Sequence, residues 1–569
     1  MLLNNIHGDK IVKFACELFE KRLQKRNVRL PEDFVLETEL SNSLAEEEYE
    51  ISDRYKDGLK ISGGSSRAVL YGFGKLLRNG SYLKGVFTPG PWRGKTTPEK
   101  PYRIIYLASH FFNVFHVGPK EFLFDYIADL AFAGYNYLSL AIQMHTRNGL
   151  DDPAYQKDVD RIHKIYEFGM KVGMKCHIGI YNGGFFNTPQ NLRAEPTGRS
   201  FFGTEICPSN PEGLELIKKI AEHRFEAFKD LDVGMVDFWS YDQGGCGCEK
   251  CRPYGYNGML KVINAIKPLA EKYWKKAKFI QTTWLFQEDE FDGLYKKFEN
   301  NSPAKSDIIM ADSHEDFPKY ILEHGLPKNT ELITFPEISM WGRCPWGGFG
   351  ATPLPKRFSR LFGQVQHLSA GGRLYCEGIY EDFNKMLYSN FFWSGNNEID
   401  LTIKEYANYE FGLADPEPLQ EVLNMMENNH YGIFWDPACG NGKTYPRALI
   451  GKKGINANTC YWKPDNCDKL LDKLKMMDCK LPDWGRDSWR WRLFMLRGII
   501  DAELARNNGN PGPECETAFK ELSQLYYTCH ETTPRCAPYT NEWIKAQNFP
   551  EKAEVNENDK VNTPLGTTD

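Results

Sequence analysis

The chain has 569 residues, more than one ordinary hydrophobic core can organise, so we expect roughly two to four domains. Its composition, 41% apolar and 26% charged, is typical of a soluble globular protein, and no apolar run is as long as the roughly 20 residues that cross a bilayer. The net charge of −6 argues against nucleic acid, because phosphate groups are bound by basic surfaces, so neither nucleic acid nor a membrane is an expected partner.

The N-terminal residues and the cysteines predict a cytoplasmic location. The segment Met1–Leu23 carries charges at the spacing of an amphipathic helix, and it lacks the apolar core and cleavage site of a signal peptide. The 15 cysteines are odd in number and scattered, a pattern typical of reduced thiols. We therefore expect a cytoplasmic protein.

Residues 1–97 have the pattern of an N-terminal α/β domain. A helix, three strands and a second helix are expected in this order: Lys10–Lys25, Phe34–Glu39, Glu48–Asp53, Leu59–Ser62 and Arg67–Leu77. The segment Pro89–Pro101 that follows is rich in proline, glycine and threonine and is predicted to be a linker.

Residues 98–398 alternate between strand-like and helix-like segments. Eight candidate strands are Arg103–Ser109, Tyr135–Ala141, Lys175–Tyr181, Val233–Trp239, Lys278–Leu285, Asp307–Ala311, Glu331–Phe335 and Gly372–Cys376. Helix-like segments between them include Glu121–Ala133, Asp158–Val172, Pro211–Lys229, Gly258–Lys272 and Lys356–Leu368. Eight such repeats predict a (β/α)8 TIM barrel, which places the chain in the α/β class.

Residues 399–549 are predicted to form a helical C-terminal domain that packs on the barrel. Its expected helices are Thr402–Glu410, Pro418–Asn428, Cys467–Met477, Ser488–Asn507 and Glu514–Thr528. Residues 550–569 are polar and poor in aromatic residues, and we expect a disordered tail there.

Carboxylates follow four of the eight predicted barrel strands. They are Asp242, Asp312, Glu337 and Glu377, and polar residues just past the strands build the active site of a TIM barrel. Glycoside hydrolysis needs one protonated carboxyl group at the leaving oxygen and one ionised carboxylate that activates water or attacks carbon. A single carboxylate at such a position is more often structural, but four together favour this catalytic interpretation.

Other polar and aromatic residues near the strand ends are candidates for binding a substrate. Aromatic residues make up 14% of the chain, and their faces stack on sugar rings. A charged sugar would also need amides or cations at its carboxylate. The candidates are His110, Asn113, His145, Tyr181, Asn182, Gln243, Trp284, His314, Trp341, Arg343, Trp346, Glu381 and Lys385.

Three cysteines lie close together after the fourth strand, in the pattern Cys246-x-Cys248-x-x-Cys251. Cys207, in the preceding loop, is a candidate for a fourth thiolate. Four thiolates would form a closed tetrahedral zinc site that is structural, because no position is left open for catalysis. Reduced buried thiols without a metal are an equally good interpretation at this point.

Several phrases of the chain resemble a bacterial family described as α-glucuronidase-like glycosyl hydrolases. They are Arg103–Asn136, Asp237–Cys251 (DFWSYDQGGCGCEKC), Thr282–Trp284 (TTW), Ala311–Pro318 (ADSHEDFP), Phe335–Gly342 (FPEISMWG) and Cys376–Lys385 (CEGIYEDFNK). The N-terminal segment Ile61–Leu77 resembles the small α/β domain that precedes the barrel in family 67 α-glucuronidases and family 20 β-N-acetylhexosaminidases.

The resemblance to family 67 implies an exo-acting, inverting glycosidase. By position, Asp242 would be the acid, and Asp312 with Glu337 would activate water. The chain departs from both families after strand four, where family 67 has a glutamate acid, family 20 has Asp-Glu and this chain has Asp242-Gln243. If Asp242 does not reach the leaving group, Glu377 or Glu288 would be the acid, and a retaining mechanism with Glu337 as nucleophile also stays open.

The expected function is an exo-acting glycoside hydrolase that needs no catalytic cofactor and cleaves a terminal sugar from an oligosaccharide or glycoside. α-Glucuronidase-like activity is the first choice and β-N-acetylhexosaminidase-type activity the second. Two other classes stay open: a carbohydrate-binding barrel without activity, and a metal-dependent lyase or isomerase that uses His110, His145 and His314. Barrels with added domains often dimerise, so a homodimer is also possible.

Overall fold

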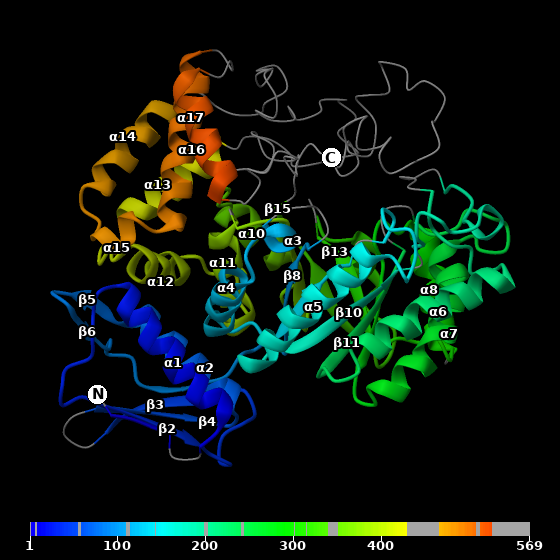
Figure 1. Cartoon of the computed structure of the whole chain (residues 1–569), viewed down its shortest axis with the longest axis horizontal. Coiled ribbons are helices and arrows are strands. Elements are labelled where there is room, and N and C mark those ends of the chain that lie inside the picture. The colour runs from blue at the N-terminus through cyan, green and yellow to red at the C-terminus, as the bar shows by residue number, and fades with distance from the viewer. Residues whose placement is uncertain are drawn as a thin grey trace.

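A computed structural model describes residues 2–5, 8–54, 58–109, 114–142, 144–181, 183–197, 203–240, 244–300, 302–313, 316–339, 351–379, 381–429, 466–507 and 512–525. Within these ranges the chain forms an N-terminal sheet with two helices, a central barrel and a group of C-terminal helices (Figure 1). None of the helices there combines the length and apolar character that crossing a bilayer requires.

The N-terminal sheet has one buried face. Its strands follow the order β1 (Leu2–Asn5), β2 (Val35–Leu40), β4 (Gly58–Gly63), β3 (Tyr49–Arg54) and β7 (Gly94–Thr96), with β3 antiparallel to its neighbours. Exposure alternates along β2 and β3, as expected where one face of a sheet packs on a core. Helices α1 (Lys10–Lys25) and α2 (Ser66–Asn79) cover that face, and the small hairpin of β5 (Ser81–Leu83) and β6 (Val86–Thr88) follows α2.

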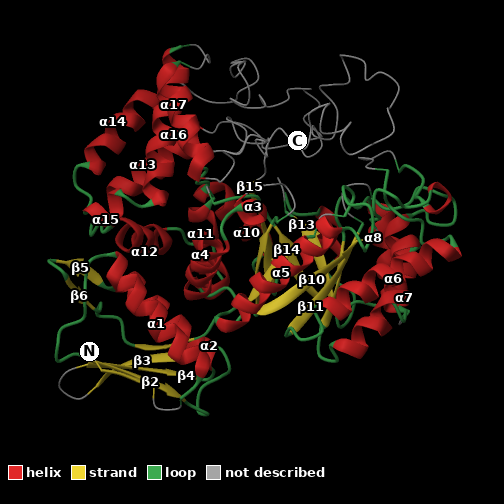
Figure 2. Cartoon of the chain, in the orientation of Figure 1, coloured by secondary structure: helices red, strands yellow, loops and turns green. Residues whose placement is uncertain are grey.

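Eight parallel strands close into a barrel, which confirms the predicted (β/α)8 TIM barrel (Figure 2). Closure is made by β16, which pairs with β14 on one side and with β8 on the other. A short additional strand, β15 (Glu337–Ser339), continues the line of β14 and also pairs with β16. The barrel strands are β8 (Tyr102–Leu107), β9 (Tyr137–Leu140), β10 (Lys175–Tyr181), β11 (Val233–Trp239), β12 (Lys278–Thr282), β13 (Ile308–Asp312), β14 (Glu331–Phe335) and β16 (Gly371–Cys376).

Helices surround the barrel and connect its strands. They are α3 (Val114–Val117), α4 (Lys120–Ala133), α5 (Pro153–Lys171), α6 (Pro211–Ala227), α7 (Gly258–Tyr273), α8 (Glu288–Glu299), α9 (Lys319–His324), α10 (Pro355–Val365) and α11 (Asp382–Ser394). Asp152 and Asn210 cap α5 and α6 by accepting backbone N–H groups, and a proline follows each cap at the first helical position. The predicted start of α6 at Pro211 is confirmed, whereas α5 begins at Pro153, five residues before the predicted Asp158, because the cap at Asp152 and its proline set the start.

The C-terminal helices pack on the barrel through buried ion pairs. They are α12 (Asp400–Phe411), α13 (Glu417–Asn429), α14 (Cys467–Asp478), α15 (Asp483–Arg486), α16 (Trp489–Arg506) and α17 (Pro513–Leu525). Arg490 of α16 pairs with Asp129 of α4 at 3.1 Å and with Asp382 of α11 at 2.6 Å. The predicted tail, residues 550–569, lies outside the described residues, and the predicted domain bounds stay predictions.

Candidate active site

The C-terminal ends of β13, β14 and β16 bring three of the predicted carboxylates to one side of the barrel mouth. Side chains alternate along a strand, and Met310, Phe335 and Tyr375 belong to the apolar cluster inside the barrel. Asp312, Glu337 and Glu377 each follow one of these residues by two positions, so the same alternation directs them inward. The outward neighbours Ala311, Ile338 and Cys376 belong instead to the core between barrel and helices.

Glu337 and Glu377 lie on adjacent strands. Glu337 is the register partner of Tyr375, and the hydroxyl of Tyr375 donates a hydrogen bond of 2.8 Å to Glu377 Oε1. Neighbouring strands are about 4.8 Å apart and each residue adds about 3.3 Å along a strand, so Glu377, two positions beyond the partner of Glu337, lies on the adjacent strand about 8 Å away along the backbone. Glu377 is only 2% exposed, whereas Glu337 and Asp312 are partly exposed. The group therefore contains both a shielded and a solvent-accessible carboxylate.

Beneath the mouth, the barrel interior holds a buried layer of polar side chains, which we call the barrel floor: Ser139, His177, Asp237 and Arg373. All four are 0% exposed. Arg373 Nη1 donates to Asp237 Oδ2 at 3.1 Å and Arg373 Nε donates to Ser139 at 3.2 Å. His177 Nδ1 lies 2.8 Å from the Ser139 hydroxyl. TIM-barrel interiors are usually filled by branched apolar side chains, so this layer is an unusual feature of the chain.

The floor holds a carboxyl group with a shifted pKa. Burial raises the pKa of Asp237 to about 6, although the Arg373 guanidinium opposes the shift. His177 Nε2 lies 3.3 Å from Asp237 Oδ1 without the alignment of a hydrogen bond, and burial lowers the pKa of His177 well below its usual value. His177 is therefore neutral at neutral pH, and Arg373 carries the charge beneath the mouth.

Aromatic rings fill the space between the floor and the mouth. Trp239, Trp284 and Phe335 contact one another edge to face, with ring centroids 4.9 to 5.7 Å apart. Leu285, directly after Trp284, has a φ of 56°, which is uncommon for a leucine and ends β12 three residues before the predicted end at Leu285. Trp284 is 6% exposed, so its ring is mainly a wall of the barrel interior.

Two further candidates near the mouth are described by the structure. Tyr181, at the end of β10, has its hydroxyl within hydrogen-bonding reach of Arg373, which connects it to the floor. His145 follows β9, and burial together with the nearby Arg147 lowers its pKa to about 4. Both side chains are therefore neutral at neutral pH, and their contact with a substrate stays a prediction.

Lys385 on α11 and Glu381 directly before that helix both lie away from solvent. Both are 0% exposed, and they form an ion pair of 2.8 Å. Lys385 Nζ also donates to the Tyr126 hydroxyl and to the Gly378 carbonyl, each at 2.8 Å. Burial raises the pKa of Glu381, and Lys385 opposes the shift. This pairing gives both residues a structural role, and their predicted substrate contacts stay untested predictions.

The remaining predicted site residues lie outside the described residues. They are the candidate acid Asp242 and the candidate binding residues His110, Asn113, Asn182, Gln243, His314, Trp341, Arg343 and Trp346.

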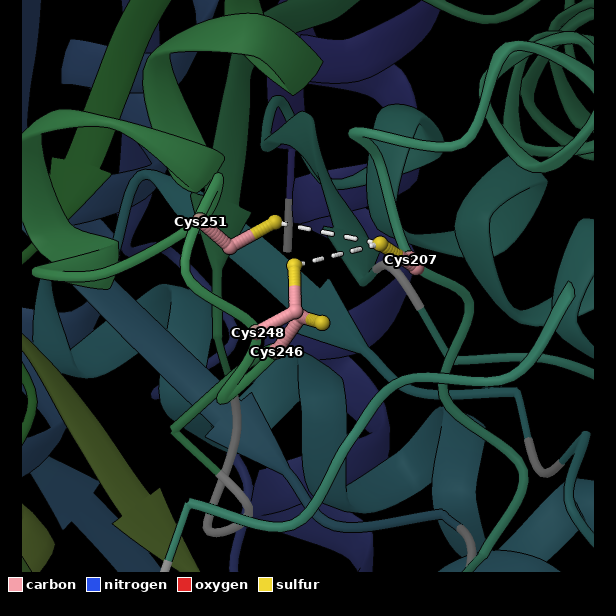
Figure 3. A group of neighbouring side chains, drawn as sticks. All are labelled: Cys207, Cys246, Cys248 and Cys251. Carbon is pink, nitrogen blue, oxygen red and sulfur yellow. Dashed lines mark hydrogen bonds between the residues drawn. The ribbon is translucent and has the colours of Figure 1, made fainter.

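The four candidate cysteines come together beside the barrel, in the two loops that follow β10 and β11 (Figure 3). Their four Sγ atoms all lie within 4.8 Å of one another. Cys207 Sγ lies 3.8 Å from Cys248 Sγ and 3.9 Å from Cys251 Sγ, so these thiols are close but not bonded as disulfides. Burial raises the pKa of the Cys207 thiol to about 11.

The sequence interpretation missed the barrel floor and Tyr375. A usable signal was present, because His177, Asp237 and Arg373 are polar residues inside otherwise apolar strands. Each lies an even number of positions from an inward-facing aromatic residue of the same strand: Tyr181, Trp239 and Tyr375, respectively. Asp237 in particular is the first residue of the phrase Asp237–Cys251, in which only Asp242 is a catalytic candidate of the sequence analysis.

No family model matches the chain, and no curated protein matches it in sequence. Solved structures do resemble it. A family GH115 4-O-methyl-α-glucuronidase with specificity for decorated arabinogalactans superposes with a TM-score of 0.58 at 11% identity, over 97% of this chain and 79% of its own. A family 89 glycoside hydrolase from Clostridium perfringens superposes with a TM-score of 0.59 at 14% identity, over 90% of this chain and 65% of its own.

A third structure, a GH138 enzyme targeting pectin rhamnogalacturonan II, has a TM-score of 0.53 at 11% identity and covers 92% of this chain and 74% of its own. The chain thus spans about two thirds of the length of the family 89 structure and more of the others. At identities this low, the likeness establishes the fold: the chain has the TIM-barrel architecture found in these glycoside hydrolases.

Proposed function

We propose that the chain is a glycoside hydrolase that cleaves a terminal sugar by carboxylate acid–base catalysis. The observation that carries the proposal is the group of three inward-directed carboxylates, Asp312, Glu337 and Glu377, at the ends of successive barrel strands. The mouth of a TIM barrel is where its enzymes have their active sites. The buried rings of Trp239 and Trp284 form an apolar wall just below them.

The substrate that we propose is an α-linked terminal sugar, with an α-glucuronide as the first choice. The similar GH115 structure is described as a 4-O-methyl-α-glucuronidase, and a similar family 89 structure was solved with its substrate GlcNAc-α-1,4-galactose. Both names refer to α-linked sugars. The action is proposed to be at the chain end of the glycan, as the resemblance of the sequence phrases implies.

In the proposed mechanism, Asp242 protonates the leaving oxygen while Glu337 and Asp312 activate a water molecule. Glu337 suits the second role because the residue is partly exposed at the mouth while one carboxylate oxygen, Oε2, is buried. Glu377 is shielded and accepts a hydrogen bond from Tyr375, so we assign it to holding a sugar hydroxyl or, if Asp242 does not reach the substrate, to the acid role. Arg373 supplies a positive charge in the barrel floor, next to Asp237, Tyr181 and Tyr106. We propose that this charge also favours the ionised form of a carboxylate at the mouth above it.

Hydrolysis of a panel of aryl glycosides tests the proposal. The panel contains α- and β-glucuronides, β-GlcNAc, β-GalNAc, and α- and β-hexosides, and it is run with wild type, Asp242→Asn and Glu337→Gln. We expect cleavage of an α-linked sugar that falls at least about 1,000-fold in both variants. Activity that survives both changes would place the catalytic site elsewhere.

The same panel distinguishes the carbohydrate-binding alternative. A barrel without activity would cleave none of the glycosides, yet calorimetry would detect sugar binding that the two substitutions weaken. Cleavage of β-GlcNAc alone would instead favour the β-N-acetylhexosaminidase-type assignment.

A further inference from the structure

We propose that Cys207, Cys246, Cys248 and Cys251 form a structural zinc site that fastens the β10–α6 loop to the β11–α7 loop. The two loops follow adjacent strands, since β10 and β11 pair along their whole length. Cys207 lies near the end of the first loop, and the other three cysteines lie in the second. This site is separate from the carboxylates of the proposed active site and does not depend on the proposed function.

The distances between the sulfur atoms fit a tetrahedral thiolate site. With Zn–S bonds of about 2.3 Å, the edges of a tetrahedron of sulfurs are about 3.8 Å. Two edges in the structure, from Cys207 to Cys248 and to Cys251, measure 3.8 and 3.9 Å, and every sulfur lies within 4.8 Å of the others. A metal ion at the centre would need only small side-chain movements. Tetrahedral sites with four sulfur ligands are typical of zinc or of iron.

Charge near the cluster is also complementary. Ser209 Oγ lies 2.9 Å from Cys251 Sγ, and Lys261 Nζ of α7 donates to that hydroxyl at 2.7 Å. Lys261 also donates to the carbonyl of Lys250 at 2.8 Å. Four thiolates with one Zn²⁺ carry two negative charges, and this lysine lies where it offsets part of them.

Glycines around the cysteine cluster let the backbones of the two loops lie close together. Gly244 and Gly245 both have positive φ, 69° and 78°, and a Cβ on Gly245 would lie 2.3 Å from the Tyr254 ring. Gly247 donates to the Glu195 carbonyl at 2.8 Å, and a Cβ there would lie 2.1 Å from the carbonyl oxygen of Pro196. The glycines therefore let the second loop press against the first, which brings the sulfurs together.

The consequence is a cross-link between residues that are far apart in sequence. Cys207 and Cys246 are 39 positions apart, and the metal would join the two loops at these points. Cys246 and Cys251 are 0% exposed, which protects the site from exchange with solvent. The site has no open coordination position, so its role is structural.

Metal analysis of the full-length chain tests the proposal. Chain purified under reducing conditions and incubated with zinc, followed by removal of excess metal, is expected to hold about one zinc ion per chain. The double variant Cys246→Ser/Cys248→Ser should lose at least about four fifths of that zinc. Cys176→Ala, which removes a buried thiol of β10, and Cys479→Ser, which removes an exposed one, should retain it.

Two measurements on the wild type keep the test decisive if the double variant does not fold. Titration with a mercurial should release zinc in step with about four thiols, as a chromophoric chelator reports. Replacement of zinc by Co²⁺ should give the intense visible bands of a tetrahedral tetrathiolate site. Less than about 0.2 zinc per chain in the wild type, bound iron in place of zinc, or disulfides among these cysteines in the intact-mass spectrum would overturn the proposal.

Discussion

Two buried carboxylates in this protein have opposite pKa shifts, and the number of cations in direct contact with each explains why. Glu405 of α12 lies in a junction with Lys75, Arg78 and Asn79 of α2, where two cations and an amide contact it at 2.7 to 3.0 Å. Burial alone would raise the pKa of Glu405, but Arg78 and Lys75 outweigh it and lower the pKa to about 2. Asp237 in the barrel floor has one arginine in direct contact, Arg373, while Arg224 acts on it from farther away, and burial outweighs both and raises the pKa of Asp237 to about 6.

The two pKa shifts distinguish two kinds of site. Glu405 belongs to a junction that stabilises the fold, whereas Asp237 belongs to the barrel floor beneath the proposed active site. The junction joins the N-terminal helix α2 to the C-terminal helix α12, and its carboxylate is ionised at every ordinary pH. The floor instead keeps a charged arginine, a carboxyl group that titrates near neutrality and a neutral histidine under the mouth.

The largest effect is expected for Arg373→Met in the floor. The substitution leaves Asp237 buried without its cation, and removing one partner of a buried pair lowers the free energy of unfolding by about 3–5 kcal/mol. Arg78→Met in the junction leaves Glu405 with Lys75 and Asn79, so we expect a smaller loss of about 1–3 kcal/mol. Urea unfolding of both variants measures the difference.

The kinetic constants kcat and KM should also distinguish Arg373→Met from Arg78→Met. Arg373→Met should lower kcat while KM changes little, because Arg373 acts through the carboxylates above it and not on the substrate. Arg78→Met should leave both constants near the wild-type values. Equal stability losses with equal activities would remove the distinction between floor and junction.

The junction should make the protein less stable in acid. Because the pKa of Glu405 is about 2 when folded and near its ordinary value of 4.5 when unfolded, its stabilisation is present above pH 4.5 and is lost as the pH falls towards 2. The shift corresponds to about 3 kcal/mol. The stability difference between wild type and Glu405→Gln should therefore shrink with acidification, as denaturant unfolding between pH 2.5 and about 7 would show. A constant difference across this range would contradict the assigned pKa.

The stability contribution of Asp237 in the barrel floor should depend on pH in the opposite direction. The folded pKa of Asp237, about 6, lies above its ordinary value of 3.8, so the folded state binds the proton more tightly than the unfolded state. Its contribution to stability is therefore greatest below pH 3.8 and falls by up to about 3 kcal/mol as the pH rises to 6. The wild type should lose stability relative to Asp237→Asn over this window. A gain in relative stability as the pH rises would show that Arg373 holds Asp237 ionised instead.

The smallest effect is expected for Tyr375→Phe. This change removes the hydroxyl that donates to Glu377 at 2.8 Å and leaves the ring contacts of the aromatic wall in place. Loss of one hydrogen bond to a charged group corresponds to about 1.5–3 kcal/mol, or a roughly 10- to 150-fold fall in kcat/KM, with little change in stability. Steady-state kinetics and thermal unfolding of the same preparation measure both. An unchanged kcat/KM would place Glu377 outside the catalytic group.

The barrel can be predicted from the sequence because the signals for its strands and helices are local. Strands β10, β11 and β14 have the predicted bounds, since each is an apolar run that ends at turn residues or a new pattern. The cysteines were also predictable, because three of them lie within six residues and Cys207 lies in the adjacent loop. Glu381 and Lys385 carried a local signal that was overlooked, since an i,i+4 pair near the start of a helix often forms an internal ion pair.

The floor could not be predicted in the same way. Its side chains come from β9, β10, β11 and β16, and Arg373 contacts Ser139 across 234 positions of sequence. Their proximity follows from strand register and barrel closure, which no short motif encodes. Candidates such as Asp242 and Trp341 lie outside the described residues, so that part of the predicted site stays a prediction.

The measurement that tests the central claim most directly compares two glutamates that lie at opposite ends of one barrel strand. Glu337 follows the C-terminal end of β14, and Glu331 begins the same strand at the far end, where it pairs with Lys278 at 2.5 Å. On the glycoside that the wild type cleaves, we predict that Glu337→Gln lowers kcat/KM at least about 1,000-fold and that Glu331→Gln stays within about threefold. A Glu337→Gln variant that is folded and retains activity within about tenfold of the wild type would contradict catalysis by the carboxylates of the barrel mouth.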